Sequence, residues 1–197
     1  MKKPSIPDVL SSTIKDMMAK RTIDEITVKE ILDACGISRP SFYRYFYDKQ
    51  ALVEYVFQKE LADPFFWDFT KDLRAREARF LRHLRKSRSF YINALKSTGQ
   101  NSLYQIWLDQ GIQSIERYFR SLAEFDGISD SDLHFFSKYL AYAYVNMDIE
   151  WLVDPSPVSA EEMARKMELM VTGGIQGILA EAKRESDKQE QPNPDGL

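Results

Sequence analysis

The chain has 197 residues and a mass of 23.0 kDa, and 44% of its residues are hydrophobic and 29% charged. This length and composition allow a buried core in one or two compact domains, and they exclude a disordered chain and a large multi-domain enzyme. The 8 glycines and 8 prolines are too few for a turn-rich β-sandwich, a barrel or a collagen-like repeat, so we expect an all-α protein. The formal net charge of −3 argues against a protein that covers nucleic acid with a basic surface.

Charge is unevenly distributed along the sequence. Residues 1–50 hold nine Lys and Arg against seven Asp and Glu, a balance of +2, whereas residues 51–197 have a balance of −5. Contacts with DNA are therefore expected near the N-terminus. The single cysteine, Cys35, and the two histidines, His83 and His134, cannot form an internal disulfide or a zinc site, so we expect no metal and no cofactor. This usage fits a reducing cytoplasmic location, and no apolar run is long enough for a membrane span.

Four short helices are predicted in the first third of the sequence, because apolar residues recur there at steps of three and four and each segment begins at a capping residue. The predicted segments cover about 5–20, 28–35, a short stretch after Ser38, and 49–61. Ser5 with Asp8 and Thr27 with Glu30 have the spacing of capping boxes at the first two starts. Gly36 occupies the place where a helix stops in a left-handed conformation, and Ser38 begins the next helix. A tight turn therefore joins the second and third helices, and residues 1–48 are predicted to be a helix-turn-helix DNA-binding domain.

The rest of the chain is predicted to form a second all-α domain over residues 49–185. Its helical patterns cover about 73–85, 87–97, 101–124, 130–153 and 159–185. The last of these begins at Ser159, with Glu162 in capping-box register. About nine helices are expected in all, followed by a disordered polar tail over residues 186–197.

The third helix carries side chains suited to nucleic acid. The spacing of Phe42 and Phe46 places them in a small core shared with the first two helices. The remaining side chains would face outward, and they combine guanidinium groups, hydroxyls and phenols: Arg39, Ser41, Tyr43, Arg44, Tyr45 and Tyr47. Because such groups suit phosphates and base edges, the composition indicates a recognition helix.

The stretch TVKEILDACGISRPSFYRYFYDKQAL, residues 27–52, resembles the DNA-binding signature of TetR-type bacterial transcription regulators. The resemblance covers about residues 5–60, and residues 80–107 more weakly resemble the C-terminal domain of the branch typified by the regulator DhaS. It implies a set of base-contacting residues: Arg39, Pro40, Ser41 and Arg44. It also implies a set of phosphate-contacting residues: Thr27, Tyr43, Tyr45 and Lys49.

Arg39 and Arg44 are the predicted specificity residues, because arginine can bind guanine O6 and N7 together, whereas a lysine near a helix N-terminus adds attraction that is blind to sequence. Pro40 departs from the small, flexible residue that many relatives have there. Pro40 offers only an apolar contact. The sequence does not specify which bases this helix reads.

The two last predicted helices favour self-association. The helix 130–153 is apolar on two faces, and the helix 159–185 has glycines beside its apolar stripe that allow close approach of another helix. In the TetR family these helices pair with their twofold mates, which implies a homodimer on a near-palindromic operator. The interface residues expected on these stripes are Leu140, Tyr144, Met147, Trp151, Met167, Met170, Gly174 and Ile178.

An effector pocket is expected inside the C-terminal domain, where aromatic rings with polar tips are frequent. The candidates are Tyr91, Asn93, Tyr104, Trp107, Tyr142 and Asn146, and the alternative is that they are ordinary core residues. Residues 71–96 hold nine Lys and Arg against two acidic residues, a balance of +7. This basic run is interpreted either as a solvated helix face or as an auxiliary phosphate contact or a site for an anionic effector.

The sequence favours a ligand-responsive repressor that binds DNA as a homodimer. The first alternative is a DhaS-like activator or co-regulator whose C-terminal domain binds a protein partner instead of a small molecule. A different class is an α-helical interaction scaffold without DNA binding. An enzyme is not expected, because the chain contains no G-x-x-x-x-G-K-[ST], G-x-G-x-x-G or H-E-x-x-H motif.

Overall fold

The computed structural model describes residues 4–61, 64–69, 72–96, 102–125, 127–155 and 157–189, and these residues contain helices and no strand. The α-helices are α1 (Ile6–Met18), α2 (Val28–Cys35), α3 (Arg39–Tyr43), α4 (Lys49–Glu60), α5 (Leu73–Lys86), α6 (Arg88–Leu95), α7 (Leu103–Arg120), α8 (Asp130–Val153) and α9 (Ala160–Gln189). Three short 3₁₀ helices lie between them: η1 (Ile23–Glu25), η2 (Pro64–Trp67) and η3 (Ala123–Phe125). The all-α prediction is confirmed.

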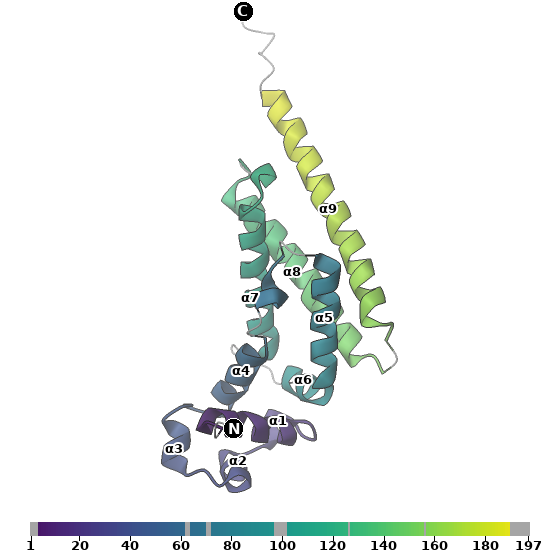
Figure 1. Ribbon diagram of the computed structural model, residues 1–197. Helices are drawn as coiled ribbons and strands as arrows, with labels where there is room; N and C mark the ends of the chain where they lie inside the picture. Colours follow the sequence, from purple (N-terminus) through teal and green to yellow (C-terminus); the bar gives the residue numbers. More distant parts are fainter. Residues whose placement is uncertain are drawn as a thin grey trace, which may run out of the picture.

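Helices α1, α2 and α3 form a small unit at one end of the molecule, drawn in purple (Figure 1). Fully buried side chains from α1 and α2 belong to the same hydrophobic cluster as Phe42 of α3: Leu10, Ile14, Met18 and Ile31. Local capping sets the helix boundaries. Ser5 and Asp8 form the predicted capping box at the start of α1, and Thr27 and Glu30 form the one at the start of α2.

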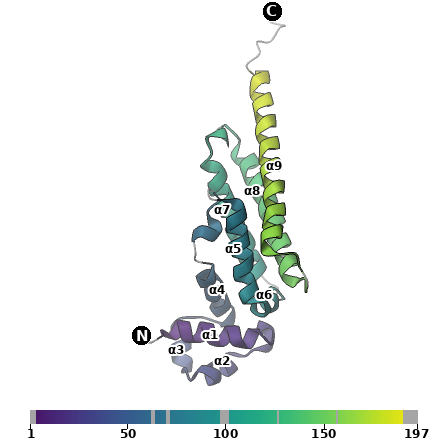
Figure 2. The ribbon, with the colours of Figure 1, turned by 45° about the vertical axis from the view of Figure 1, so that its right-hand side comes forward.

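The other end of the molecule is built from α5, α7, α8 and α9. Helix α7 packs against α8, and α9 packs against α5. Helix α4 leads from the N-terminal unit into this body, since it packs against α1 on one side and α7 on the other (Figure 2). Among the residues that the structure describes, no helix combines the length and the apolar character needed to cross a membrane.

Helix α9 is longer than the sequence pattern indicates. It continues through residues 186–189, which were predicted to belong to the tail, and residues 190–197 lie outside the described ranges. Side chains from the first part of α9 are buried, among them Met163, Met167 and Val171. Its later part projects past the rest of the body (Figures 1 and 2).

Candidate nucleic-acid interface

The turn between α2 and α3 has the geometry that the sequence predicts. Gly36 ends α2 with φ 67° and ψ 25°, a left-handed conformation that a residue with a Cβ adopts only at a cost. The Ser38 hydroxyl accepts the backbone N–H of Ser41 at 3.3 Å and lies 2.8 Å from the Ser41 hydroxyl. These contacts define where α3 begins and how it leaves α2.

One side of α3 is held in the core and the other is open to solvent. Phe42 is completely buried, whereas the three tyrosines Tyr43, Tyr45 and Tyr47 are 47%, 46% and 66% exposed. The guanidinium of Arg39 lies 5.9 Å from the ring of Tyr43, and that of Arg44, just after the end of α3, lies 5.2 Å from the ring of Tyr45. Pro40 is exposed beside them. The free surface is therefore a cluster of cations, phenols and one proline.

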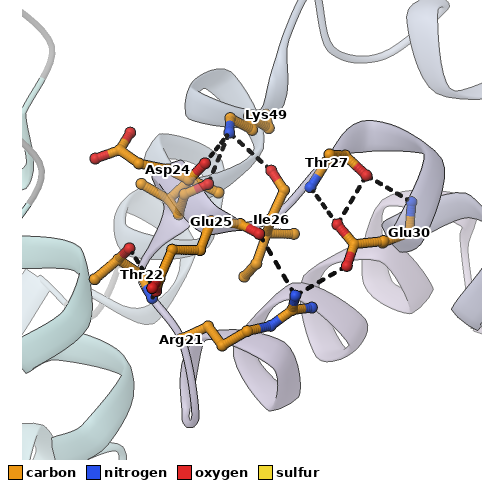
Figure 3. A network of polar contacts seen from close by, with 9 residues as sticks. Arg21, Thr22, Asp24, Glu25, Ile26, Thr27, Glu30 and Lys49 are labelled. Carbon is orange, nitrogen blue, oxygen red and sulfur yellow. Dashed lines mark hydrogen bonds and ion pairs between the residues drawn. The ribbon is translucent and has the colours of Figure 1, made fainter.

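Two of the residues with predicted phosphate contacts have polar partners inside the chain (Figure 3). The Lys49 ammonium donates to the backbone carbonyls of Ile23, Asp24 and Ile26 at 2.8, 3.3 and 2.7 Å. Because an ammonium has three hydrogens, these carbonyls occupy all of them. The Thr27 hydroxyl donates to the Glu30 carboxylate at 2.8 Å as part of the capping box. In this arrangement Lys49 holds the segment before α2, and Thr27 holds the start of α2.

A further ion pair braces the same segment. Arg21 donates to the Glu30 carboxylate at 2.9 Å, and the backbone N–H of Thr27 donates to it at 2.7 Å. These contacts, first the Thr27 N–H and then the Arg21 guanidinium, hold the pKa of Glu30 at about 2. Thr22 and Glu25 form a third capping box, on η1, which was not predicted from the sequence (Figure 3). The entry to the helix-turn-helix is therefore fixed by local polar contacts.

Sequence models of two families of regulators match the chain. Residues 12–56 match bacterial regulatory proteins of the tetR family, and residues 78–173 match a transcriptional regulator C-terminal region. The first range contains α2, the turn at Gly36 and the exposed α3. The chain belongs to the TetR family. It is a transcriptional regulator with an N-terminal DNA-binding domain.

Relatives of this TetR-family chain share its fold more clearly than its sequence. The chain is 30% identical over 64 residues to the HTH-type dhaKLM operon transcriptional activator DhaS of Lactococcus lactis, a match that covers 32% of this chain and 34% of that protein. A solved structure of the dihydroxyacetone kinase operon activator DhaS superposes with a TM-score of 0.64 at 19% identity, over 86% of this chain and 96% of that chain.

Two further solved structures come from the same family. A TetR transcriptional regulator from Streptococcus agalactiae superposes with a TM-score of 0.62 at 13% identity, covering 83% of this chain and 91% of that chain. A tetR-family regulator from Streptomyces coelicolor superposes with a TM-score of 0.60 at 20% identity, covering 96% and 93%. At these identities the likeness concerns the fold.

Glu60, the last residue of α4, connects the DNA-binding unit of this TetR-family protein to the body. Its carboxylate accepts hydrogen bonds from the Lys15 ammonium of α1 and, at 3.2 Å, from the Tyr91 hydroxyl of α6. His83 of α5 places Nε2 3.4 Å from the same carboxylate. Burial alone raises the pKa of Glu60, but His83 and Lys15 outweigh it and lower this pKa to about 2. One carboxylate thus joins four helices.

The stability of this junction is expected to depend on acid pH. Because the folded-state pKa of Glu60 lies below its ordinary value of 4.5, its stabilising effect is complete above about pH 4.5 and disappears as the pH falls towards 2. We expect Glu60→Gln to lower the free energy of unfolding by about 2 to 3 kcal/mol near neutral pH and by much less near pH 3. Urea unfolding at several pH values measures this difference. The exposed Glu150→Gln is the matched control, and a pH-independent difference would contradict the assignment.

The six side chains predicted to line an effector pocket lie in three separate places. Asn93 donates to the carbonyl of Met18 of α1 at 2.7 Å, and Tyr91 donates to Glu60 at the end of α4 at 3.2 Å. Trp107 is buried among core rings. The remaining three lie on α7 and α8, where Tyr142 and Asn146 are exposed, Tyr104 is half-buried, and Asn146 approaches the Tyr104 hydroxyl at 3.4 Å.

Trp107 is the member of that set that lines a buried cavity with charged groups. Three charged residues lie at this cavity that the sequence reasoning did not select: Arg76, Glu77 and Asp148. Arg76 was counted in the basic run, but Glu77 and Asp148 do carry a sequence signal. Each falls on the buried stripe of its helix, Glu77 before Phe80 and Leu84 and Asp148 between Tyr144 and Trp151. Acidic residues are rare on the apolar stripe of a helix, so this position alone marks Glu77 and Asp148 as candidate functional residues.

The residues predicted for the dimer interface divide into two groups. Tyr144, Trp151 and Met167 are buried within the chain at 7%, 7% and 8% exposure, because they pack on α5 and its neighbours, and Leu140 and Ile178 are half-buried against the same core. Met147, Met170 and Gly174 are exposed. Other exposed apolar side chains accompany them on α8 and α9: Phe135, Tyr139, Tyr142 and Leu169. We call Phe135, Tyr139, Tyr142, Met147, Leu169 and Met170 the apolar α8/α9 face.

Several cations of the basic run have structural partners. Arg76 is buried, Arg82 pairs with Glu161, and Arg85 lies 5.2 Å from the ring of Trp151. Arg88 donates to the carbonyls of residues 152 and 153 at 2.8 and 2.7 Å. Lys71 lies outside the described residues. Several of the cations in this run thus connect α5 and α6 to α8 and α9.

Within the described ranges, no three His, Cys, Asp or Glu side chains gather as they would around a metal ion.

Proposed function

We propose that this protein is a homodimeric, sequence-specific regulator that reads a near-palindromic operator through α3. The observation that carries the proposal is the exposed surface of α3, where Arg39 and Arg44 stand beside two exposed tyrosines on a helix anchored by the buried Phe42. Guanidinium groups can read guanine, and tyrosine hydroxyls can hold phosphates. Ser41 and Pro40 complete the proposed base-contacting surface, with Pro40 suited to a thymine methyl group.

Support for a homodimer comes from the apolar α8/α9 face. Leu169 and Met170 are 60% and 78% exposed, and Phe135 and Tyr139 are 63% and 67% exposed. A second copy related by twofold symmetry would cover this face with the same face. The exposed Gly173, Gly174 and Gly177 would let the partner's backbone come close. Two copies then present two α3 helices to one duplex, which is why a near-palindromic site is proposed.

Repression is the regulatory sign that we propose, with release of the operator when an effector changes the body. The contacts of Glu60 with Lys15 and of Asn93 with Met18 support such coupling, since they join α4 and α6 to α1, and the bond from Tyr91 to Glu60 joins α6 to α4. An effector acts only through a difference in affinity between the two arrangements. The alternative is an activator with a protein partner, and the relative DhaS is a transcriptional activator.

The proposal is tested by selecting bound duplexes from a random DNA pool. We expect a near-palindrome to be enriched, and we expect Arg44→Ala to relax the preference at one base pair per half-site, at a cost of about 1 to 3 kcal/mol. Arg44→Lys keeps the charge but loses the bidentate contact, so it should relax the preference with less loss of overall affinity. The exposed Lys20→Ala is the control for loss of positive charge.

Absence of any enriched sequence at low salt would contradict DNA reading by α3 and would favour the scaffold alternative. Transcription in vitro from a promoter that contains the selected site then gives the regulatory sign. Reduced transcript on addition of the protein supports repression, and increased transcript supports the activator. A stoichiometric protein partner that is required for the increase would distinguish the DhaS-like mode from a small-molecule effector.

A further inference from the structure

Each of the two arginines on the α3 surface lies over a tyrosine ring. The guanidinium of Arg39 is 5.9 Å from the ring of Tyr43, one helical turn further along α3, and that of Arg44 is 5.2 Å from the ring of Tyr45. At both distances a cation is attracted to the face of an aromatic ring. Neither arginine has a carboxylate partner within the described residues, so the ring is the partner that the structure gives to each of these long side chains.

The two tyrosine rings are themselves held by the core. Tyr43 packs edge-on against Phe42, with ring centroids 5.3 Å apart and planes at 88°, and Tyr45 lies beside Phe46 with centroids 6.5 Å apart. Phe42 and Phe46 are buried. Each arginine is therefore connected to the core through an exposed tyrosine and then a buried phenylalanine. A side chain that is held in this way loses less conformational freedom on binding than one that moves freely.

An arginine that lies over a ring keeps its base-reading edge available. The guanidinium is planar, so a ring can cover its face while the N–H groups at its edge point away from the ring. These edge N–H groups are the ones that bind guanine O6 and N7 together. Tyr45 is 46% exposed, so its ring holds Arg44 at the surface and does not draw it into the core. The ring and a base therefore do not compete for the same part of the guanidinium.

We propose that Tyr45 and Tyr43 are positioning residues, whose rings hold Arg44 and Arg39 in the orientation in which these arginines read bases. This role rests on the proposed function, and it is separate from the role of the tyrosine hydroxyls. A hydroxyl that binds a phosphate adds affinity for every sequence. A ring that acts through an arginine instead changes how strongly one base is preferred over another.

Two substitutions of Tyr45 separate these roles. The measured quantity is the ratio of the dissociation constants for the selected operator and for the same operator changed at the base pair where Arg44→Ala relaxes the preference. Tyr45→Phe keeps the ring and removes the hydroxyl, so we expect weaker binding to both duplexes by a similar factor and an unchanged ratio. Tyr45→Leu also removes the ring, so we expect the preference expressed by this ratio to decrease about two- to fivefold, the size of a cation–π contact at an exposed site.

A double variant and a third tyrosine provide the controls. Because the ring acts through the arginine, Tyr45→Leu should have no further effect on the ratio when Arg44 is replaced by alanine. Tyr47→Leu is the matched control, since Tyr47 is 66% exposed and no arginine of the described ranges lies over its ring; it should leave the ratio unchanged. Tyr43→Phe and Tyr43→Leu make the same comparison for Arg39. An unchanged ratio in Tyr45→Leu, an equal loss in Tyr45→Phe, or an equal effect of Tyr45→Leu with and without Arg44 would overturn the proposal.

The free protein gives a second readout that needs no operator. In the full chain with isotope-labelled arginine, the NMR signal of the Arg44 Nε–H group, assigned by its loss in Arg44→Ala, should be displaced by the ring current of Tyr45. We expect this displacement to persist in Tyr45→Phe and to disappear in Tyr45→Leu, after circular dichroism has confirmed that each variant is folded. A signal that stays the same in Tyr45→Leu would overturn the positioning role even where an operator is selected. If the displacement behaves as expected but the wild type selects no operator, the proposed function fails and the reading role of both arginines fails with it.

Discussion

Replacing Lys49 by methionine is expected to lower the free energy of unfolding of the N-terminal unit by about 3 to 5 kcal/mol. The side chain would keep its length, but the carbonyls of Ile23, Asp24 and Ile26 would lose a charged donor at 2.7 to 3.3 Å. Two of these contacts are partly buried, so water does not fully replace the donor. Urea unfolding followed by circular dichroism measures the loss.

The same variant separates a structural role of Lys49 from a phosphate contact. If Lys49 holds the segment before α2, the salt dependence of operator binding stays as in the wild type wherever the variant is folded. If instead it binds phosphate, stability is retained and the salt slope decreases by about one. Lys49→Arg is the second variant for the case in which the methionine chain does not fold, since it keeps the charge. Lys20→Met is the stability control, because Lys20 is exposed in the turn that follows α1.

The fold was predictable because its signals are local in the sequence. Ser5 with Asp8 and Thr27 with Glu30 lie three residues apart, and the structure forms both capping boxes where they were expected. The predicted helices agree with the observed ones to within a few residues, apart from the longer α9. Its extension past residue 185 could not be predicted from the polar tail composition, because a long helix is stabilised by what packs along it and not by propensity alone.

The candidate sites were less predictable because their contacts join distant parts of the sequence. Lys49 binds carbonyls that precede it by 23 to 26 residues, and no local pattern marks that contact. Asp148 comes to Arg76 and Glu77 only because α8 packs against α5. The spacing of aromatic residues indicated a pocket. On a helix that is apolar on two sides, however, the repeat of 3.6 residues per turn does not show which rings point into the core and which face solvent. The base-contacting residues on α3 stay predictions.

The second large effect that we expect comes from disrupting the proposed dimer. The double substitution Leu169→Asp and Met170→Asp should convert the dimer to a monomer at micromolar concentration and lower operator affinity by about a hundredfold or more. Both side chains are highly exposed in the single chain, so their replacement leaves the monomer core intact. In a twofold interface each copy would bring two carboxylates into an apolar contact, where unpaired charges are costly. Light scattering after size-exclusion chromatography measures the mass.

The control is Gln113→Glu, which adds a carboxylate at an exposed position of α7, outside the apolar α8/α9 face. This variant should stay dimeric and bind the operator normally. A half-site duplex provides the second comparison, because the monomeric variant should bind it as well as the wild type does if only the pairing of two α3 helices has been lost. A double variant that remains a dimer with full operator affinity would show that the chains associate through a surface other than the apolar α8/α9 face.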